Sequence, residues 1–218
     1  MTEKIEVKTS AQAANNQVAG ENRAFFQEKS LPVLNLVSSP GSGKTSLLEK
    51  MAIHYGKGLA VITGDIQMTY DADRVRKAGA QAVQIETHGT CHLTAAMVQS
   101  KFRELDWKGV KLLVIENIGN LVCPSTYDLG EHLKVALLSV AEGDEKPMKY
   151  PALFLRAGAV VFTKMDLLPH VDFDVARAKE DCLKLNPQTR FFSVSCKTGA
   201  GMAEWLDFLK TLQIQPAK

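Results

Sequence analysis

The sequence predicts an α/β domain in which a predominantly parallel sheet carries helices on both faces. From Leu31 onward, apolar segments of strand length alternate with amphipathic segments of helix length, a pattern typical of βαβ units. Strands such as LLVI and AVVF are apolar throughout, as expected for strands covered on both faces. A phosphate-binding loop follows the first strand and narrows the class to P-loop nucleoside triphosphatases.

The expected strands and helices follow one another in near-regular alternation. Seven strands are predicted, at Val33–Val37, Leu59–Thr63, Ala82–Glu86, Leu112–Glu116, Val135–Val140, Ala159–Thr163 and Phe191–Ser195. Five helices are predicted, at Lys44–His54, Asp71–Ala78, His92–Leu105, Phe173–Leu185 and Met202–Leu212. Residues 141–150 are expected to form a long loop. We expect residues 31–218 to form one P-loop domain, and the polar residues 1–30 to form a loosely attached N-terminal helical segment with little to bury.

Composition excludes several classes of function. The net charge is only +2 and the basic residues are scattered, which disfavours a nucleic-acid partner. The polar N-terminus contains Glu3 and Glu6, unlike a secretory signal, and no apolar run has the length of a membrane span. Four widely spaced cysteines do not suggest a disulfide framework. We therefore expect a cytoplasmic protein without a membrane partner, some of whose cysteines are free to act as ligands.

The segment SSPGSGKT lies between a predicted strand and a predicted helix, the context that a phosphate-binding loop requires. Its small residues let backbone N–H groups approach phosphates, and the helix N-terminus adds partial positive charge. We expect Lys44 to reach the terminal phosphates and Thr45 to ligate magnesium, while Ser38 occupies the place of the first consensus glycine. The predicted phosphate contacts are Pro40, Gly41, Ser42, Gly43, Lys44, Thr45 and Ser46.

Two strand ends predict a guanine base. The segment TKMD is close to the Asn-Lys-x-Asp pattern of many GTPases, with Thr163 in place of Asn. Asp166 would accept hydrogen bonds from guanine N1–H and the 2-amino group, and Lys164 would lie along the ring. The strand FFSVS ends in a second candidate base loop, formed by Ser195, Cys196 and Lys197. Together these segments predict that the nucleotide is GTP.

The strand KLLVIE ends in Glu116, at the position of the second acidic motif of P-loop enzymes. Glu116 could hold magnesium directly or through water, and the Gly119 N–H could contact the γ-phosphate. Asp65 is a second candidate for the magnesium shell. Asn120 stands where some GTPases have a water-positioning Gln, which suggests slow unassisted hydrolysis. The candidate catalytic residues are therefore Lys44, Asp65 and Glu116.

A second candidate metal site consists of Cys91, His92 and Cys123. Both segments follow predicted parallel strands, at the edge where ligands bind such sheets. Two thiolates and an imidazole suit zinc, nickel or copper rather than magnesium or calcium. Three protein ligands leave a position open for exchange or for a ligand from another subunit. His88 is a further candidate ligand.

Six segments together resemble the HypB family of hydrogenase nickel-incorporation (maturation) GTPases. They are SSPGSGKT, GDIQMTYDADR, the Cys91-His92 pair, ENIGNLVCP, EGDEKPMKYP and TKMDLLP, and the resemblance covers roughly residues 20–212. It implies a SIMIBI-class GTPase, a metallochaperone that couples the GTPase cycle to nickel delivery during [NiFe]-hydrogenase maturation. It further implies nickel or zinc at Cys91, His92 and Cys123, alongside GTP and magnesium.

The same resemblance implies a nucleotide-stabilised homodimer and other hydrogenase maturation proteins as partners. Three alternatives remain open. One is a urease-accessory nickel GTPase, which the segment ENIGNLVCP disfavours. Another is a P-loop small-molecule kinase, although no Arg-rich lid segment is present in the sequence. The third is a metal carrier that binds nucleotide as a switch without hydrolysing it.

Overall fold

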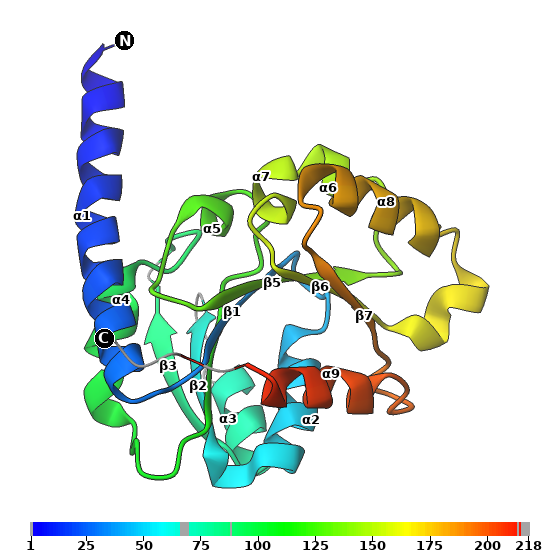
Figure 1. Ribbon diagram of the computed structural model, residues 1–218, viewed down its shortest axis with the longest axis horizontal. Helices are drawn as coiled ribbons and strands as arrows, with labels where there is room; N and C mark the ends of the chain where they lie inside the picture. Colours follow the sequence, from blue (N-terminus) through cyan, green and yellow to red (C-terminus); the bar gives the residue numbers. More distant parts are fainter. Residues whose placement is uncertain (1, 66–69, 88, 213, 215–218) are drawn as a thin grey trace.

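The computed structural model describes residues 2–65, 70–87, 89–212 and 214, without the side chains of residues 2–10 and Asp65. Its centre is a seven-stranded parallel sheet in the order β3-β2-β4-β1-β5-β6-β7 (Figure 1). The strands are β1 (Val33–Ser38), β2 (Leu59–Asp65), β3 (Gln81–Glu86), β4 (Leu112–Glu116), β5 (Leu133–Ser139), β6 (Ala159–Thr163) and β7 (Arg190–Ser193). All seven predicted strands are present, and the α/β class is confirmed.

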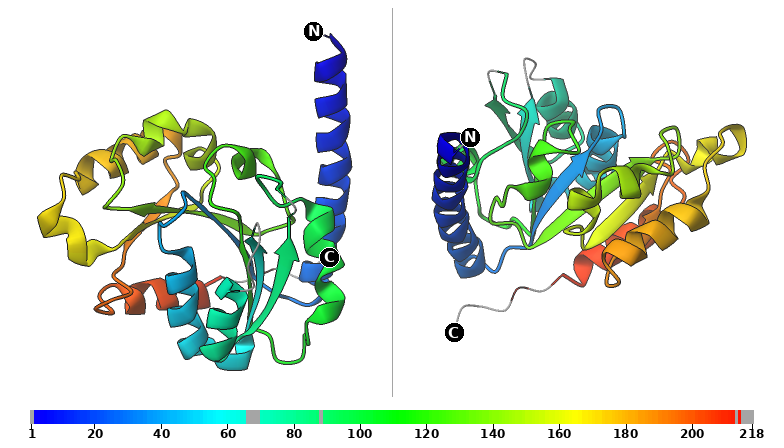
Figure 2. Two further views of the ribbon diagram at one scale, coloured as in Figure 1. Left: turned by 180° about the vertical axis from the view of Figure 1, so that it is seen from behind. Right: turned by 90° about the horizontal axis from the view of Figure 1, so that it is seen from above.

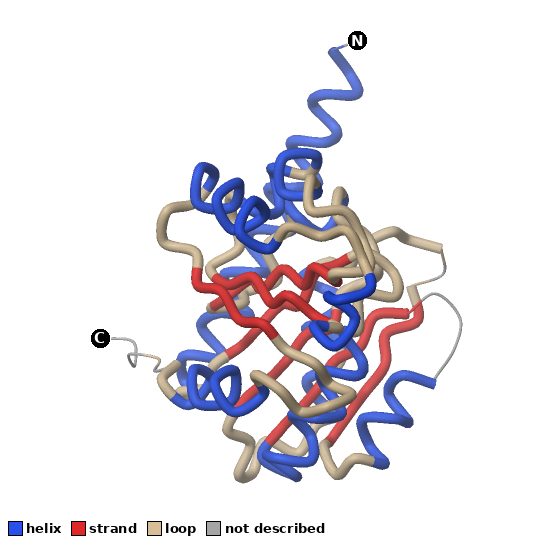
Figure 3. Tube along the Cα trace, turned by 90° about the vertical axis from the view of Figure 1, so that its right-hand side faces the viewer, coloured by secondary structure: helices blue, strands red, loops and turns tan. Residues whose placement is uncertain are grey.

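Helices cover both faces of this sheet, as Figures 2 and 3 show from other directions. One face carries α2 (Lys44–Tyr55), α3 (Tyr70–Lys77) and α9 (Met202–Lys210). The other carries α1 (Thr2–Glu28), α4 (Ala95–Ser100), α5 (Cys123–Thr126), α6 (Lys146–Lys149), α7 (Pro151–Phe154) and α8 (Val175–Leu185). Short 3-10 turns lie at Gly56–Gly58, Phe102–Glu104 and Met165–His170. Among the described residues, no helix combines the length and apolar character needed to cross a bilayer.

The side chains of the strands explain why helices must cover both faces of the sheet. In β1, Leu36 is fully buried with the α2 and α9 residues, whereas its neighbour Val37 is fully buried with residues of α7 and α8. Successive side chains of a strand point to opposite faces, so an all-apolar strand requires a helix layer on each side. The carboxyl ends of the parallel strands consequently lie at one edge, where connecting loops can form a ligand site.

Helix α1 differs from the sequence-based expectation. Its first half extends clear of the globular body (Figure 1), but Ala19, Asn22 and Phe26 are fully buried. Phe26 belongs to the same core cluster as strand residues of β1, β2 and β4. The expectation of a loosely attached segment with little to bury is therefore wrong for the second half of this helix.

The predicted helix at His92–Leu105 also begins later than expected. Thr94 is its N-cap, and the Thr94 Oγ1 accepts a hydrogen bond from the Met97 N–H at 3.3 Å. Because a capping residue has non-helical backbone, the residues before it are left in the preceding loop. Cys91 and His92 thus lie in a loop. The predicted loop at 141–150 contains the short helix α6.

Candidate nucleotide and metal sites

The phosphate-binding loop connects β1 to α2. Gly41 and Gly43 have φ angles of 74° and 94°, in the left-handed region that favours glycine. The Lys44 ammonium donates to the Ser38 Oγ at 3.0 Å. The serine that replaces the consensus glycine therefore supplies an acceptor that holds the lysine over the loop.

A cleft of about 550 Å³ opens above this loop. It is lined by Pro40, Gly41, Gly43, Lys44, Thr45, Ser46, Gly64, Asp71, Arg74, Glu116, Asn117, Ile118, Gly119 and Lys164. Most of the residues predicted to contact phosphate thus line this cleft. The exception is Ser42, a loop residue whose side chain is fully buried. Arg74, which the sequence analysis did not single out, lines the cleft and pairs with Glu49 at 2.6 Å. Its only sequence signal was its place within the segment GDIQMTYDADR.

The two predicted magnesium ligands at the cleft floor are in contact. The Thr45 hydroxyl donates to the Glu116 carboxylate at 2.8 Å, and both residues are buried. A hydroxyl and a carboxylate offer the hard oxygen donors that magnesium prefers. Asp65 is the last residue of β2, and its side chain lies outside the described part of the chain.

A second set of side chains supports the loop from outside the cleft. The Glu142 carboxylate accepts from the Ser42 hydroxyl at 2.6 Å and pairs with Lys146, which also donates to the Ser39 Oγ at 2.7 Å. Burial alone would raise the pKa of Glu142, but hydrogen bonds from Lys146, Ser42 and Ser39 outweigh it and hold the pKa below its usual range. Glu142 and Lys146 belong to the segment EGDEKPMKYP, which contributed to the family resemblance, but nothing in the sequence indicated this contact with the phosphate loop.

The candidate base-binding loops meet at the ends of β6 and β7. Ser195 donates to the Asp166 carboxylate at 2.6 Å. That hydrogen bond, together with the charges of Lys197 and Lys164, holds the pKa of Asp166 below its usual range, so the group is an anionic acceptor at neutral pH. Thr163 has a different part: its hydroxyl donates to the Ser42 carbonyl at 2.6 Å and ties the base loop to the phosphate loop.

The remaining base-loop residue, Cys196, is half-buried, and burial raises the pKa of its thiol. It packs against the core cluster beneath α9, and the neighbouring Lys197 is exposed.

The structure brings the three candidate soft-metal ligands together. Cys91 and His92 lie in the loop after β3, and Cys123 begins α5 after β4; their ligand atoms all lie within 4.8 Å of one another. Burial lowers the pKa of His92, which favours the neutral imidazole that binds metals. The hydrogen bond with Cys123, reinforced by burial, raises the pKa of the Cys91 thiol. His88 lies outside the described residues.

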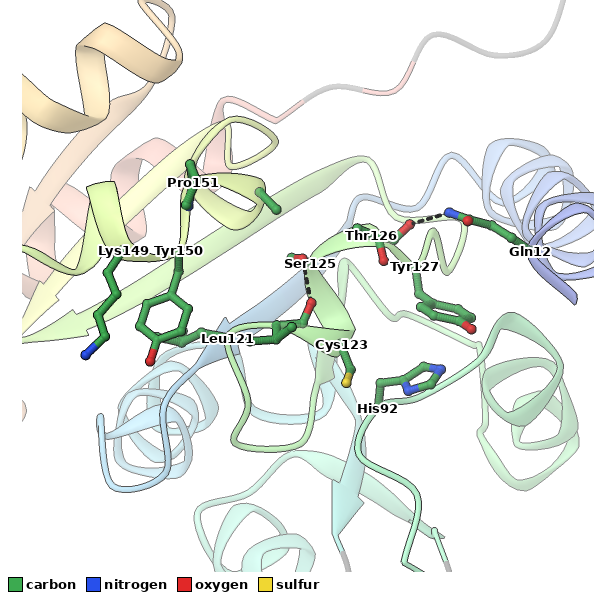
Figure 4. Close-up of a pocket in the computed structure, with 12 residues that line it drawn as sticks. Gln12, His92, Leu121, Cys123, Ser125, Thr126, Tyr127, Lys149, Tyr150 and Pro151 are labelled. Atoms are coloured by element: carbon green, nitrogen blue, oxygen red, sulfur yellow. Dashed lines mark hydrogen bonds between the residues drawn. The ribbon is translucent and has the colours of Figure 1, made fainter. Parts of the chain in front are cut away.

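A pocket of about 580 Å³ adjoins the candidate metal site and includes His92 and Cys123 in its lining. Figure 4 shows the His92 and Cys123 side chains beside each other at its edge, with the imidazole extending toward the Tyr127 ring. The centroids of these two rings are 3.9 Å apart. The pocket is lined by Gln12, His92, Leu121, Val122, Cys123, Ser125, Thr126, Tyr127, Lys149, Tyr150, Pro151 and Ala152.

The segment from Glu116 to Cys123 connects the nucleotide cleft to the metal site. A Cβ added to Gly119 would lie 2.9 Å from Pro40 atoms, so only glycine allows this close approach to the phosphate loop. Asn120 donates to the Cys91 carbonyl at 3.2 Å. The Asn120 amide thus binds the loop that carries Cys91. A residue that positions water for hydrolysis would instead point into the nucleotide cleft.

Asn117 makes a second connection between the two sites. Its Oδ1 accepts from the Leu93 N–H, next to His92, at 3.3 Å, and its Nδ2 donates to the Asn35 Oδ1 at 3.2 Å. Asn117 is fully buried. The linking roles of Asn117 and Asn120 were missed, although both lie in the segment ENIGNLVCP that the sequence analysis noted.

A phosphate-binding loop between strand and helix, a buried threonine–glutamate pair and an aspartate after β6 are the features of a P-loop nucleotide-binding domain. A sequence profile of the CobW/HypB/UreG nucleotide-binding domain matches residues 32–193. The chain is 48% identical to the hydrogenase maturation factor HypB of Azotobacter chroococcum, over 94% of this chain and 68% of that protein. The chain therefore belongs to the HypB family.

Two further relatives come from Helicobacter pylori. The crystal structure of HypB from that organism in complex with nickel superposes with a TM-score of 0.87 at 42% identity, covering 90% of this chain and 94% of the other. The hydrogenase/urease maturation factor HypB of its strain J99 is 43% identical, over 89% of this chain and 82% of that protein. The chain thus matches proteins named for nickel-enzyme maturation along most of its length.

Proposed function

We propose that this protein hydrolyses GTP and couples that cycle to the binding and delivery of nickel during [NiFe]-hydrogenase maturation. The observation that carries the proposal is the segment from Glu116 to Cys123, which begins in the nucleotide cleft and ends in the soft-metal ligand set. A single short segment with a residue in each site can transmit a change at one to the other. Membership of the HypB family and the nickel complex of a 42%-identical relative support nickel as the cargo.

In this proposal each residue has a defined part in nucleotide binding. The loop amides and Lys44 would neutralise the phosphates, and Thr45 and Glu116, together with Asp65, would hold magnesium. The Gly119 N–H contacts the γ-phosphate, and Asp166 reads the guanine edge. Magnesium supplies the charge that offsets the negative charge on the phosphates as the bond breaks.

Partners and boundaries are also proposals. On family membership we propose a homodimer stabilised by GTP, other maturation proteins as partners, and residues 31–218 as the GTPase domain behind an N-terminal helix. Sedimentation with a non-hydrolysable GTP analogue should shift the protein toward dimer. A monomer at every concentration, with and without metal, would contradict the dimer.

A kinase on the same fold would use ATP, so base preference separates it from a GTPase. Asp166→Asn should weaken GTP binding and favour xanthosine triphosphate, because the substitution exchanges an acceptor for a donor where guanine offers N–H groups. Competition of the three nucleotides for wild type and variant measures the effect. We expect GTP affinity to fall at least about 100-fold, since a buried polar mismatch discriminates strongly. Asp172→Asn, beyond the base loop, is the control, and unchanged selectivity in Asp166→Asn would remove that residue from the base site.

A further inference from the structure

Helix α1 contacts the two segments that carry the metal ligands, here called the ligand-bearing loops. One runs through His92 into the start of α4, and the other begins with Cys123, the first residue of α5, and continues past α5 to residue 130. Apolar residues of α1 such as Phe26 pack in the core. In addition, two asparagines of the helix, Asn15 and Asn22, are buried against these loops. A separation of seven residues is close to two helical turns, so both side chains lie on one face of α1.

Asn15 bonds to both loops with its single amide. Its Oδ1 accepts from the Ala95 N–H at 2.9 Å, and its Nδ2 donates to the Asp128 carbonyl at 2.8 Å. Ala95 lies three residues after His92, and Asp128 lies five residues after Cys123. A primary amide offers an acceptor oxygen beside an NH₂ donor in one plane, a combination that neither an ionised Asp nor a Ser hydroxyl provides.

Asn22 repeats the arrangement two turns later. Its Nδ2 donates to the Ala95 carbonyl at 2.9 Å and to the Leu129 carbonyl at 3.1 Å. The backbone N–H and C=O of Ala95 are thus each held by a different asparagine of the same helix. Both asparagines join the same two loops, and the two helix turns between them keep the two bridges at a fixed spacing.

We propose that Asn15 and Asn22 are positioning residues that hold the two ligand-bearing loops at the separation one metal ion requires. This inference rests on the proposed metal function. The helix on which they stand is a rigid element, and a ligand set is most selective when rigid elements fix its spacing. Without the bridges, the loop of Cys91 and His92 and the loop of Cys123 would vary in separation, and metal binding would have to restrict them.

The test compares metal affinity in Asn15→Ala, Asn22→Ala and wild type by titration with nickel. We expect about tenfold weaker binding in each variant, since loss of the groups that orient metal ligands typically costs about 10- to 100-fold. Affinity for a non-hydrolysable GTP analogue should stay within about twofold of wild type, because neither asparagine lines the nucleotide cleft. Asn15→Leu is a second variant that keeps the size of the side chain and removes both hydrogen bonds.

The matched control is Phe25→Ala. Phe25 also attaches α1 to the body, stacking on Phe102 at 4.7 Å between centroids and edge-on to Trp107 at 5.3 Å, and both of these partners lie beyond the end of α4. Its metal affinity should stay within about twofold of wild type while its thermal stability falls. If all variants lose metal affinity in proportion to their loss of stability, the asparagines only attach the helix and the inference is wrong.

A readout without metal uses a trivalent arsenical. Phenylarsine oxide condenses with two neighbouring thiols to form two As–S bonds and release one water, so it reports whether Cys91 and Cys123 are held together. We expect about tenfold weaker capture in the asparagine variants than in wild type or Phe25→Ala. Wild-type protein that binds no nickel would overturn the proposed function. Normal nickel binding in wild type with unchanged nickel and arsenical binding in the asparagine variants would overturn this inference alone.

Discussion

Lys44→Ala is expected to lower the turnover of GTP by about 100- to 1,000-fold, the typical loss when one preorganised donor to a developing negative charge is removed. The Lys44 ammonium lies above the phosphate loop at 3.0 Å from the Ser38 Oγ and lines the cleft. Steady-state phosphate release with magnesium and saturating GTP measures the effect. The fold should persist, because the side chain faces the cleft rather than the apolar core.

The matched control for that variant is Lys57→Ala. Lys57 is an exposed lysine in the 3-10 turn that follows α2, at the opposite end of the helix from the phosphate loop. Its turnover should equal that of wild type. Full turnover in Lys44→Ala would show that the loop does not carry the phosphate chemistry.

Cys123→Ala is expected to weaken nickel or zinc binding at least about 100-fold, since loss of a direct ligand should cost no less than the outer-shell changes that typically cost about 10- to 100-fold. The remaining Cys91 and His92 come from one loop and cannot close a site by themselves. GTP turnover with magnesium, but without nickel or zinc, should be close to wild type, because Cys123 does not line the nucleotide cleft. Isothermal titration with each metal measures the loss.

Cys182→Ala is the control for that loss. Cys182 is fully buried on α8, and burial raises its pKa to about 12, so its thiol is a poor metal ligand. Metal affinity in this variant should match wild type. Equal loss in Cys182→Ala and Cys123→Ala would remove Cys123 from the metal site.

The sheet and most residues of the cleft above the phosphate loop could be predicted from the sequence because each depends on local signals. Seven apolar segments of strand length are enough to place a parallel sheet covered on both faces. The phosphate loop is defined by spacing within eight residues, so Gly43, Lys44 and Thr45 could be placed without knowing the tertiary structure. The meeting of Cys91, His92 and Cys123 could be anticipated because their segments follow strands that end at the same edge.

The second half of α1 could not be read from the sequence because its buried face is partly polar. Helix burial is ordinarily recognised by apolar residues at helical spacing, but Asn15 and Asn22 are buried by hydrogen bonds to loop backbone. Those partners are more than 70 residues away in the chain. No local pattern identifies such partners.

The polar residues that connect one loop to another could not be predicted from the sequence for a related reason. The residues that link the loops do so through hydrogen bonds to backbone or to polar side chains of other segments; they are Asn117, Asn120, Glu142 and Thr163. Residue type alone does not say which loop a short polar side chain will contact. Thr163 illustrates the point, since in sequence it is a departure from the Asn of the base motif, whereas in the structure it holds the phosphate loop.

We expect nucleotide state and metal affinity to be coupled through the segment from Glu116 to Cys123. Ordering of such a segment by a γ-phosphate, and its release on hydrolysis, is a known switching device. The bonds from Asn117 to Leu93 and from Asn120 to Cys91 would carry the movement to the other ligand loop. A typical coupling is about 1 to 3 kcal/mol, which corresponds to about 5- to 150-fold in affinity.

The most direct measurement is a nickel titration of wild-type protein loaded with GDP and, separately, with a non-hydrolysable GTP analogue, with Cys123→Ala as the background. We expect the two wild-type affinities to differ by about 5- to 150-fold, and nickel to change the affinity ratio of the two nucleotides by the same factor, as linkage requires. Equal nickel affinities in the two nucleotide states, with binding still dependent on Cys123, would contradict the coupling.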